Sequence, residues 1–542
     1  MQKPTRTCLL IVFCLLSSVF CPPAYANNIT TSNVTINTQS TANKTCVVQF
    51  DISWQNSWRN PMNYDAAWVF VKYSTDGGST WAHATLKASG TNPSGFSGGS
   101  GTGVDIIVPS EKKGAFIQRA AAGKGTVTAT GVQLVWDWGA DGLSQNSATP
   151  ISLDTDLRVK VFAVEMVYVR TGSFYIGDGN GVTQATGALH QIDMTGVKIS
   201  TLLEQTIRGD ATYDDSTLNS GIGIQGDGGL DTNYDGIIEN PNFPTGYNAS
   251  YVMKYEISQG QYRDFLNTLT RAQQNSRVSS NVSLDAPENI YVMSNSAAVS
   301  NRNGICAPAF GNGTASPITF GCDLNGDGIY NEAFDGEWIA CNWLSWADLV
   351  AYADWAALRP MTELEFEKAC RAVISKVLGE YAWGNIGITT TNSVRSGTNG
   401  TSSEIAGSPE SGQNGLCDYN NNAIGGPLRC GFAAGSNTTR AQAGSSYYGV
   451  MELSGNLWER AVTLGNATGR NFTGLNGDGS LDTNGNANVA NWPGINAVGA
   501  GFRGGDWSNI GAYAQVSNRV KAANTVATRD NNSGGRLVRT AT

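Results

Sequence analysis

The chain has 542 residues and a formal net charge of −9, from 44 acidic and 35 basic residues. Its lysines and arginines form no cluster, which argues against nucleic acid or an anionic membrane as a partner. The 65 glycines and the low share of charged residues, 15%, are typical of a loop-rich extracellular protein rather than a helical enzyme.

Residues 1–26 are predicted to form a secretory signal peptide. Lys3 and Arg6 make a basic start, residues 9–16 an apolar core, and Ala24-Tyr25-Ala26 a small-x-small cleavage site. The core is shorter than the roughly 20 apolar residues of a membrane-spanning helix, and no later run approaches that length. We expect a secreted protein, extracellular or at the cell surface, without a transmembrane segment. Losing Lys3 and Arg6 with the signal takes the net charge from −9 to −11.

Cysteines beyond the signal are expected to meet oxidising conditions, so disulfides are plausible. Their number is odd and leaves at least one thiol unpaired, and the connectivity stays open. Cys417 with Cys430, and Cys306 with Cys322 or Cys341, are near in sequence. The sequence contains no C-x-x-C pair, so neither a redox motif nor a cysteine zinc site is indicated.

Residues 27–162 are predicted to form a β-sandwich. Strands are expected at 47–54, 67–73, 132–136 and 157–161, because these runs are rich in β-branched and aromatic residues. Glycine- and serine-rich turns separate them, and helical periodicity is missing. The aromatic residues are expected in the core rather than on a carbohydrate-binding platform.

Residues 163–542 are predicted to form a second, mixed domain, which gives an α+β protein with few and short helices. Ser258 is followed by Gln261, and Thr362 by Glu365, at capping-box spacing. Helices are therefore expected near 259–271, 346–357 and 363–371.

Three C-terminal runs carry the strongest motifs: YGVMELSGNLWE at 448–459, GFRGGDW at 501–507 and GGRLVR at 534–539. Two earlier runs, RPMTELEFE at 359–367 and YAWGN at 381–385, precede them in order. Together they resemble the formylglycine-generating-enzyme (sulfatase-modifying-factor) family. That resemblance implies a C-type-lectin-like fold and, in active members, oxidation of a sulfatase cysteine.

The resemblance also implies a copper-binding pair of active-site cysteines downstream of the RGG run, and here the matching positions hold Asn509 and Ala514. Copper chemistry of that kind needs soft thiolates, which these side chains lack. Iron is not expected either, because two lone histidines, His83 and His190, cannot form a facial triad. We therefore predict no catalytic residues and neither metal.

A calcium ion is the cofactor that the resemblance implies, held by Glu452, the carbonyls of Gly455 and Leu457, and Glu459. Calcium takes six to eight oxygen ligands, and this short turn offers carboxylates and carbonyls together. The alternative is that Glu459 forms an ion pair with a neighbour such as Arg460.

Two further loops read D-x-N-x-D-G-x-x-(E/N), which matches the first nine positions of an EF-hand-type calcium loop. Both lack the usual glutamate at position 12 and evident flanking helices, so plain Asp/Asn/Gly turns are the alternative. The candidate ligands are Asp231, Asn233, Asp235 and Glu239 in one loop, and Asp323, Asn325, Asp327 and Asn331 in the other.

The segment 506–532 mixes Trp, Tyr, Ser and Asn between the glycine-rich frames, and such mixtures suit binding surfaces. It resembles the display region of C-type-lectin-like binding proteins, although ordinary loops are the alternative. A buried frame of Arg503, Gly504, Gly505 and Arg536 is expected to support it. The predicted contact residues are Trp507, Ser508, Asn509, Tyr513, Gln515 and Asn518.

The function that follows is a secreted, calcium-stabilised binding or structural protein without catalytic activity, whose ligand is an unknown protein or carbohydrate. One alternative is an active oxidoreductase of the family with displaced catalytic residues, for which Cys417 or Cys430 would have to reach the site. The other is a calcium-dependent protein that binds carbohydrate or a variable ligand.

Overall fold

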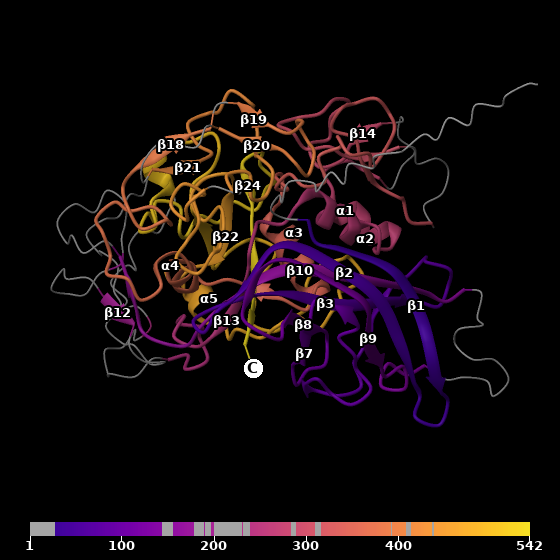
Figure 1. Ribbon diagram of the computed structural model, residues 1–542. Helices are drawn as coiled ribbons and strands as arrows, with labels where there is room; N and C mark the ends of the chain where they lie inside the picture. The colour runs from indigo at the N-terminus through magenta and orange to yellow at the C-terminus, as the bar shows by residue number, and fades with distance from the viewer. Residues whose placement is uncertain are drawn as a thin grey trace, which may run out of the picture.

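The computed structural model describes residues 28–143, 156–177, 189, 197–199, 230, 239–282, 289–308, 316–391, 393–407, 414–435 and 438–541. The predicted signal peptide lies outside these ranges. Strands far outnumber the short helices, which confirms an α+β protein (Figure 1). Among the described residues no helix is long and apolar enough to cross a membrane.

Two antiparallel sheets build the N-terminal half and confirm a sandwich. The smaller has the order β1 (Thr30–Ser40), β2 (Thr45–Arg59), β9 (Gly123–Trp136) and β6 (Ser100–Gly101). The larger has the order β17 (Arg359–Pro360), β25 (Leu537–Thr540), β13 (Ser250–Met253), β10 (Arg158–Val169), β3 (Asp65–Ser74), β8 (Ala115–Arg119), β7 (Val104–Val108) and β5 (Gly90–Thr91), with β4 (Ala82–His83) also on β3.

Strand β3 is buried along its whole length because it faces two hydrophobic cores. Val69 and Val71 point into the core between the two sheets, whereas Trp68 and Phe70 point into the core shared with the helices. The two-residue side-chain period of a strand divides them in this way. The Trp68 indole also donates to the Ala356 carbonyl at 2.8 Å, just beyond a helix.

The sheet continues from the sandwich into the C-terminal half through β10. Residues 158–167 of β10 pair with β3, and residues 166–169 pair with β13. The predicted domain boundary at 162/163 therefore falls inside a continuous strand. Strand β3 of the sandwich and strand β25 near the C-terminus consequently belong to one sheet, with β10 and β13 between them.

Five helices occur in the described part of the chain: α1 (Gln259–Leu266), α2 (Arg271–Arg277), α3 (Trp346–Trp355), α4 (Glu363–Arg371) and α5 (Ala467–Arg470). Capping boxes begin α1 at Ser258 and α4 at Thr362, as predicted. The predicted first helix runs too far, because Asn267 caps α1 and Thr270 opens a new capping box for α2. The short α5 was not predicted.

Long loops and small sheets make up the rest. The small sheets comprise β11 (Phe174–Ile176) with β12 (Val197–Ile199); β14 (Ile290–Tyr291), β15 (Ile305–Ala307) and β16 (Gly321–Cys322); β18 (Ile388–Thr390) with β21 (Gly415–Cys417); β19 (Val394–Ser396) with β20 (Ile405–Ala406); and β22 (Trp458–Val462), β23 (Ala500–Arg503) and β24 (Ser533–Gly534). Disulfides do not pin these loops. All seven cysteines in the described part of the chain are free and buried. Buried ion pairs hold these loops instead; for example, Arg519 lies 2.6 Å from Glu363.

A buried ion triad joins the sandwich to the second half. Lys254, directly after β13, lies 2.9 Å from Glu165 of β10 and 3.4 Å from Asp65 of β3. Burial by itself opposes the charge, but Glu165 and Asp65 raise the pKa of Lys254 above its ordinary value. The lysine therefore stays charged and pairs with both acidic side chains inside the sheet.

Replacing Lys254→Ala should destabilise the protein by about 3–5 kcal/mol, because it leaves buried carboxylates without a cation. Chemical denaturation measures the change. Lys87→Ala is the matched control: it breaks the exposed pair with Asp137 at 3.0 Å and should cost no more than about 1 kcal/mol. Equal losses for the two variants would contradict a special role of the triad.

Candidate functional site

The C-terminal motif runs meet in one three-stranded sheet. β22 pairs with β23 in the antiparallel sense and with β24 in the parallel sense. The Trp507 amide donates to the Asn456 carbonyl at 2.9 Å. The turn before β22 and the loop after β23 therefore lie side by side.

Arg503 holds the loop that follows β23. Its guanidinium donates to the carbonyls of Val516 and Asn518, each at 2.9 Å, and pairs with Glu367. Gly505 has a φ of +73°, and a Cβ there would lie 2.8 Å from the Ala514 nitrogen. The predicted frame is confirmed as buried at Arg503, Gly504, Gly505 and Arg536.

Asp506 organises the positions where the resemblance places thiols. One of its oxygens accepts from the Ser508 backbone amide at 2.7 Å and from the Ser508 hydroxyl at 2.6 Å. The other oxygen accepts from the side-chain amide of Asn509. Ala514 is buried, and its carbonyl accepts from the Ser454 hydroxyl at 2.7 Å. The side-chain amide of Asn509 and the methyl group of Ala514 thus occupy the two positions. Neither group is a ligand that fits copper.

Cys417 is connected to Ala514 through Ser454. Its Sγ donates to the Ser454 carbonyl at 3.1 Å, and a Cβ at Gly455 would lie 2.4 Å from it. Burial raises the pKa of Cys417, and the neighbouring carboxylates of Asp418 and Asp506 add to the rise. A buried, protonated thiol is neither a metal ligand nor a nucleophile.

Three glutamates lie buried beside the same turn: Glu256, Glu452 and Glu459. Glu459 accepts a hydrogen bond from Nε of Arg536 at 2.8 Å, and its other oxygen forms an ion pair with Nη2 at 2.6 Å. Glu256 accepts from the Leu457 amide at 3.0 Å and from the Asn456 side chain. The sequence analysis assigned no role to Glu256. Its position in the mostly apolar run 251–257 was the feature that could have indicated a buried acid.

Glu452 is the least satisfied member of this carboxylate cluster. One of its oxygens accepts from the Gly431 amide at 2.9 Å, while the other is buried without a hydrogen-bond partner. Burial raises the pKa of Glu452 to about 7, against the opposing charges of Arg536 and Arg429. Burial therefore favours the protonated form of Glu452.

The test of a calcium site gives a divided result. The unpartnered Glu452 oxygen suits a cation, but both oxygens of Glu459 are engaged by Arg536. The observed ion pair is the alternative named above, with Arg536 as the partner rather than Arg460. Within the described ranges no group of three or more His, Cys, Asp or Glu side chains is arranged to hold a metal.

The loop at Asp323 closes on its own hydrogen bonds. The buried Asp323 carboxylate accepts from the amides of Gly326 at 2.8 Å and Gly328 at 3.2 Å. Asn331 accepts from the Cys322 amide at 3.0 Å. These contacts match the Asx-turn alternative.

The other candidate ligands of these two loops are less informative. Asn325 and Asp327 bond to each other at 3.0 Å. Glu239 is exposed, and its amide donates to the Leu230 carbonyl at 3.2 Å. Asp231, Asn233 and Asp235 lie outside the described residues.

The predicted contact residues divide between the surface and the interior. Trp507 and Asn518 are buried, with 4% and 3% of their surface exposed, so they support the loop rather than form its surface. The Trp507 indole donates to the Asn531 carbonyl at 3.2 Å. Ile510, which the sequence did not single out, is 58% exposed between them. The half-buried members are Ser508, Asn509, Tyr513 and Gln515.

Comparison with known families agrees with this geometry. The model of the sulfatase-modifying factor enzyme 1-like domain, FGE-sulfatase, matches residues 221–541, which include α1–α4, the carboxylate cluster and the loop after β23. The match begins later than the expected second domain at 163. No curated protein matches the chain. Because the match covers more than half of the 542 residues, the chain belongs to the FGE-sulfatase family.

Proposed function

We propose that this family member is a secreted binding protein without catalytic activity, stabilised by calcium, whose contact surface is the loop 506–518. The observation that carries the proposal is the composition of that loop. Its backbone is anchored by the buried Arg503 and Arg519, while Asn509 and Ala514 stand where active relatives would carry thiols.

The anchored loop suits recognition by a preorganised surface. Ser508, Asn509, Tyr513 and Gln515 are half-buried, so each presents part of its side chain to solvent. A backbone that is already fixed loses little entropy on binding. Serine and asparagine supply adaptable hydrogen bonds, and tyrosine supplies a rigid aromatic contact.

The oxidoreductase alternative finds little support in the available thiols. Cys417 and Cys430 are buried, and burial raises the pKa of each. The Cys430 thiol donates to the Glu256 carbonyl at 3.4 Å. Neither is the exposed thiolate that such chemistry requires.

Tyr513→Ala should abolish capture of a partner while changing stability little, because the side chain is half-buried and a contact residue can contribute about 2 kcal/mol or more to binding. Trp507→Ala should instead unfold the loop at a cost of about 3–5 kcal/mol. Quantitative pull-downs from native extracts and parallel thermal melts separate the two effects. Full partner capture by a stable Tyr513→Ala variant would contradict the proposed surface.

We place calcium beside the carboxylate cluster, with Glu452, Glu459 and the carbonyls of Gly455 and Leu457 as ligands. The ion would supply positive charge beside Glu452, and Arg536 would share Glu459 with it. Its role is structural. Glu452 and Glu459 are 5% and 0% exposed, which leaves no room for a sugar on the same ion and disfavours calcium-dependent carbohydrate binding there.

Without calcium, stability should fall as pH rises from 4.5 to about 7, because folded Glu452 keeps a proton that the unfolded chain releases. The loss is about 3 kcal/mol, and Glu452→Gln should remove it. Thermal melts in excess chelator at pH 5 and pH 8 measure both effects.

Added calcium should restore the wild-type melting temperature at pH 8, because a ligand bound only by the folded state stabilises it. It should not affect Glu452→Gln, while Asp137→Asn, a change on the sandwich surface, should respond like the wild type. Identical wild-type melts in chelator and in calcium would contradict the site.

A further inference from the structure

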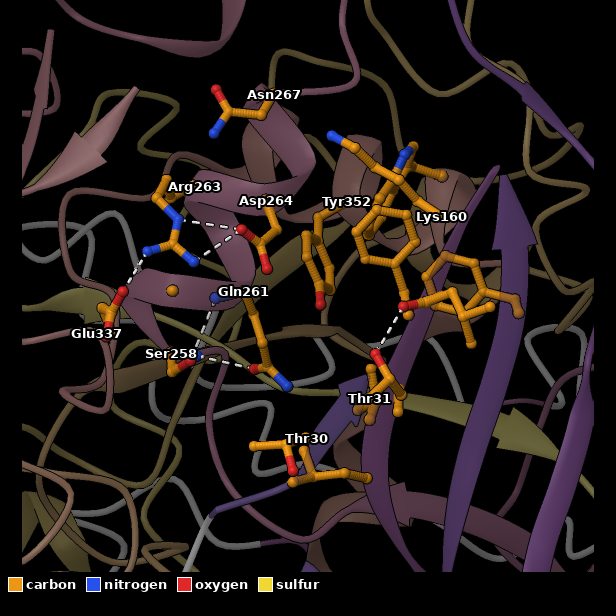
Figure 2. A pocket seen from close by; sticks show the side chains of 18 of the residues that line it. Thr30, Thr31, Lys160, Ser258, Gln261, Arg263, Asp264, Asn267, Glu337 and Tyr352 are labelled. Atoms are coloured by element: carbon orange, nitrogen blue, oxygen red, sulfur yellow. Dashed lines mark hydrogen bonds and ion pairs between the residues drawn. The ribbon is translucent and has the colours of Figure 1, made fainter. Parts of the chain in front are cut away.

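A cavity of about 540 Å³ lies between the sandwich and α1 (Figure 2). Strands β1 and β10 line one side, and α1, α3 and the segment 337–338 line the other. Its size is typical of small-molecule sites, which often lie where two parts of a protein meet. It contains none of the carboxylate cluster and none of the loop 506–518.

Aromatic side chains form the inner wall of the cavity. Trp355 packs edge-on against Phe70 at 5.0 Å and against Phe162 at 4.9 Å between ring centroids. Tyr352 lies 5.4 Å from Trp355 on the same helix. These contacts fix the rings, so the wall is a preformed apolar surface.

Charged groups of both signs line the mouth. Arg263 lies 2.8 Å from Asp264 and also pairs with Glu337. Lys160 is the second cation, and its pKa is lowered by burial, which the charge of Asp264 opposes. Two cations and two anions balance, and the Asp264 side chain remains 44% exposed.

Tyr352 supplies the observation that points to a ligand. The residue is only 1% exposed, and it lines the cavity. Figure 2 shows its hydroxyl directed into the space between α1 and β1. A polar group of a ligand in the cavity would take the place of water at this hydroxyl.

We propose that this cavity binds a neutral saccharide. A charged ligand finds no excess of opposite charge at the balanced mouth. A wholly apolar ligand would remove Arg263, Asp264 and Tyr352 from water without replacing their hydrogen bonds. Sugar hydroxyls both donate and accept, so they satisfy guanidinium, carboxylate and phenol together, while the C–H face of the ring packs on the aromatic wall.

The site is independent of the loop 506–518 and of calcium, so each proposal can fail without the other. Saturation-transfer NMR on the full chain tests it with glucose, galactose, mannose, N-acetylglucosamine and their disaccharides. Glucuronate, glucosamine and indole serve as charged and apolar comparison ligands. At least one neutral saccharide should show transfer, and the signal should persist in excess chelator.

Two pocket variants place the binding in the cavity. Tyr352→Phe and Asp264→Ala should each weaken saccharide binding roughly tenfold or more, which corresponds to one lost hydrogen bond to a charged or buried group. Tyr447→Phe, a half-buried tyrosine that does not line the cavity, is the matched control and should bind as the wild type does. Thermal melts confirm that each variant is folded.

Three outcomes would overturn the proposal. The first is no transfer to any neutral saccharide by the folded wild-type chain. The second is transfer only to indole or to the charged sugars, which would assign the cavity to another ligand class. The third is undiminished binding by folded Tyr352→Phe and Asp264→Ala variants, or loss of binding in chelator, which would place the saccharide elsewhere.

Discussion

Burial of strand β3 on both faces is the constraint on which the rest of the structure depends. Alternate residues of β3 belong to two different hydrophobic cores, so the strand is covered by the second sheet on one side and by helices on the other. The sandwich and the family domain therefore share a sheet, and Lys254 pairs with the two acids where they join. The cavity between β10 and α1 exists because of this arrangement.

In the C-terminal site, buried arginines hold the loops of the family scaffold. Arg503, Arg519 and Arg536 use buried carboxylates and carbonyls to fix the loops, and these contacts do not involve the positions of the thiols. Asn509 and Ala514 fit the existing network, one through Asp506 and the other through Ser454.

Local patterns were readable from the sequence, and long-range pairing was not. The side-chain period identified the β2 and β3 strands, and capping boxes located the starts of α1 and α4. The joining of β10 to β13, the Arg536–Glu459 pair and the burial of Trp507 depend on residues far apart in the chain. The cavity could not be predicted for the same reason. Its walls include β1 and α1, which lie far apart in the sequence.

We propose that the folded chain has no thiolate metal centre at the positions of Asn509 and Ala514. Titration of the full chain with Cu(I) against the coloured chelator bicinchoninate tests this most directly. We predict that the chelator keeps all the copper until denaturant exposes the buried thiols. One equivalent of copper withheld by the folded chain, and released in a Cys417→Ser or Cys430→Ser variant, would contradict the account.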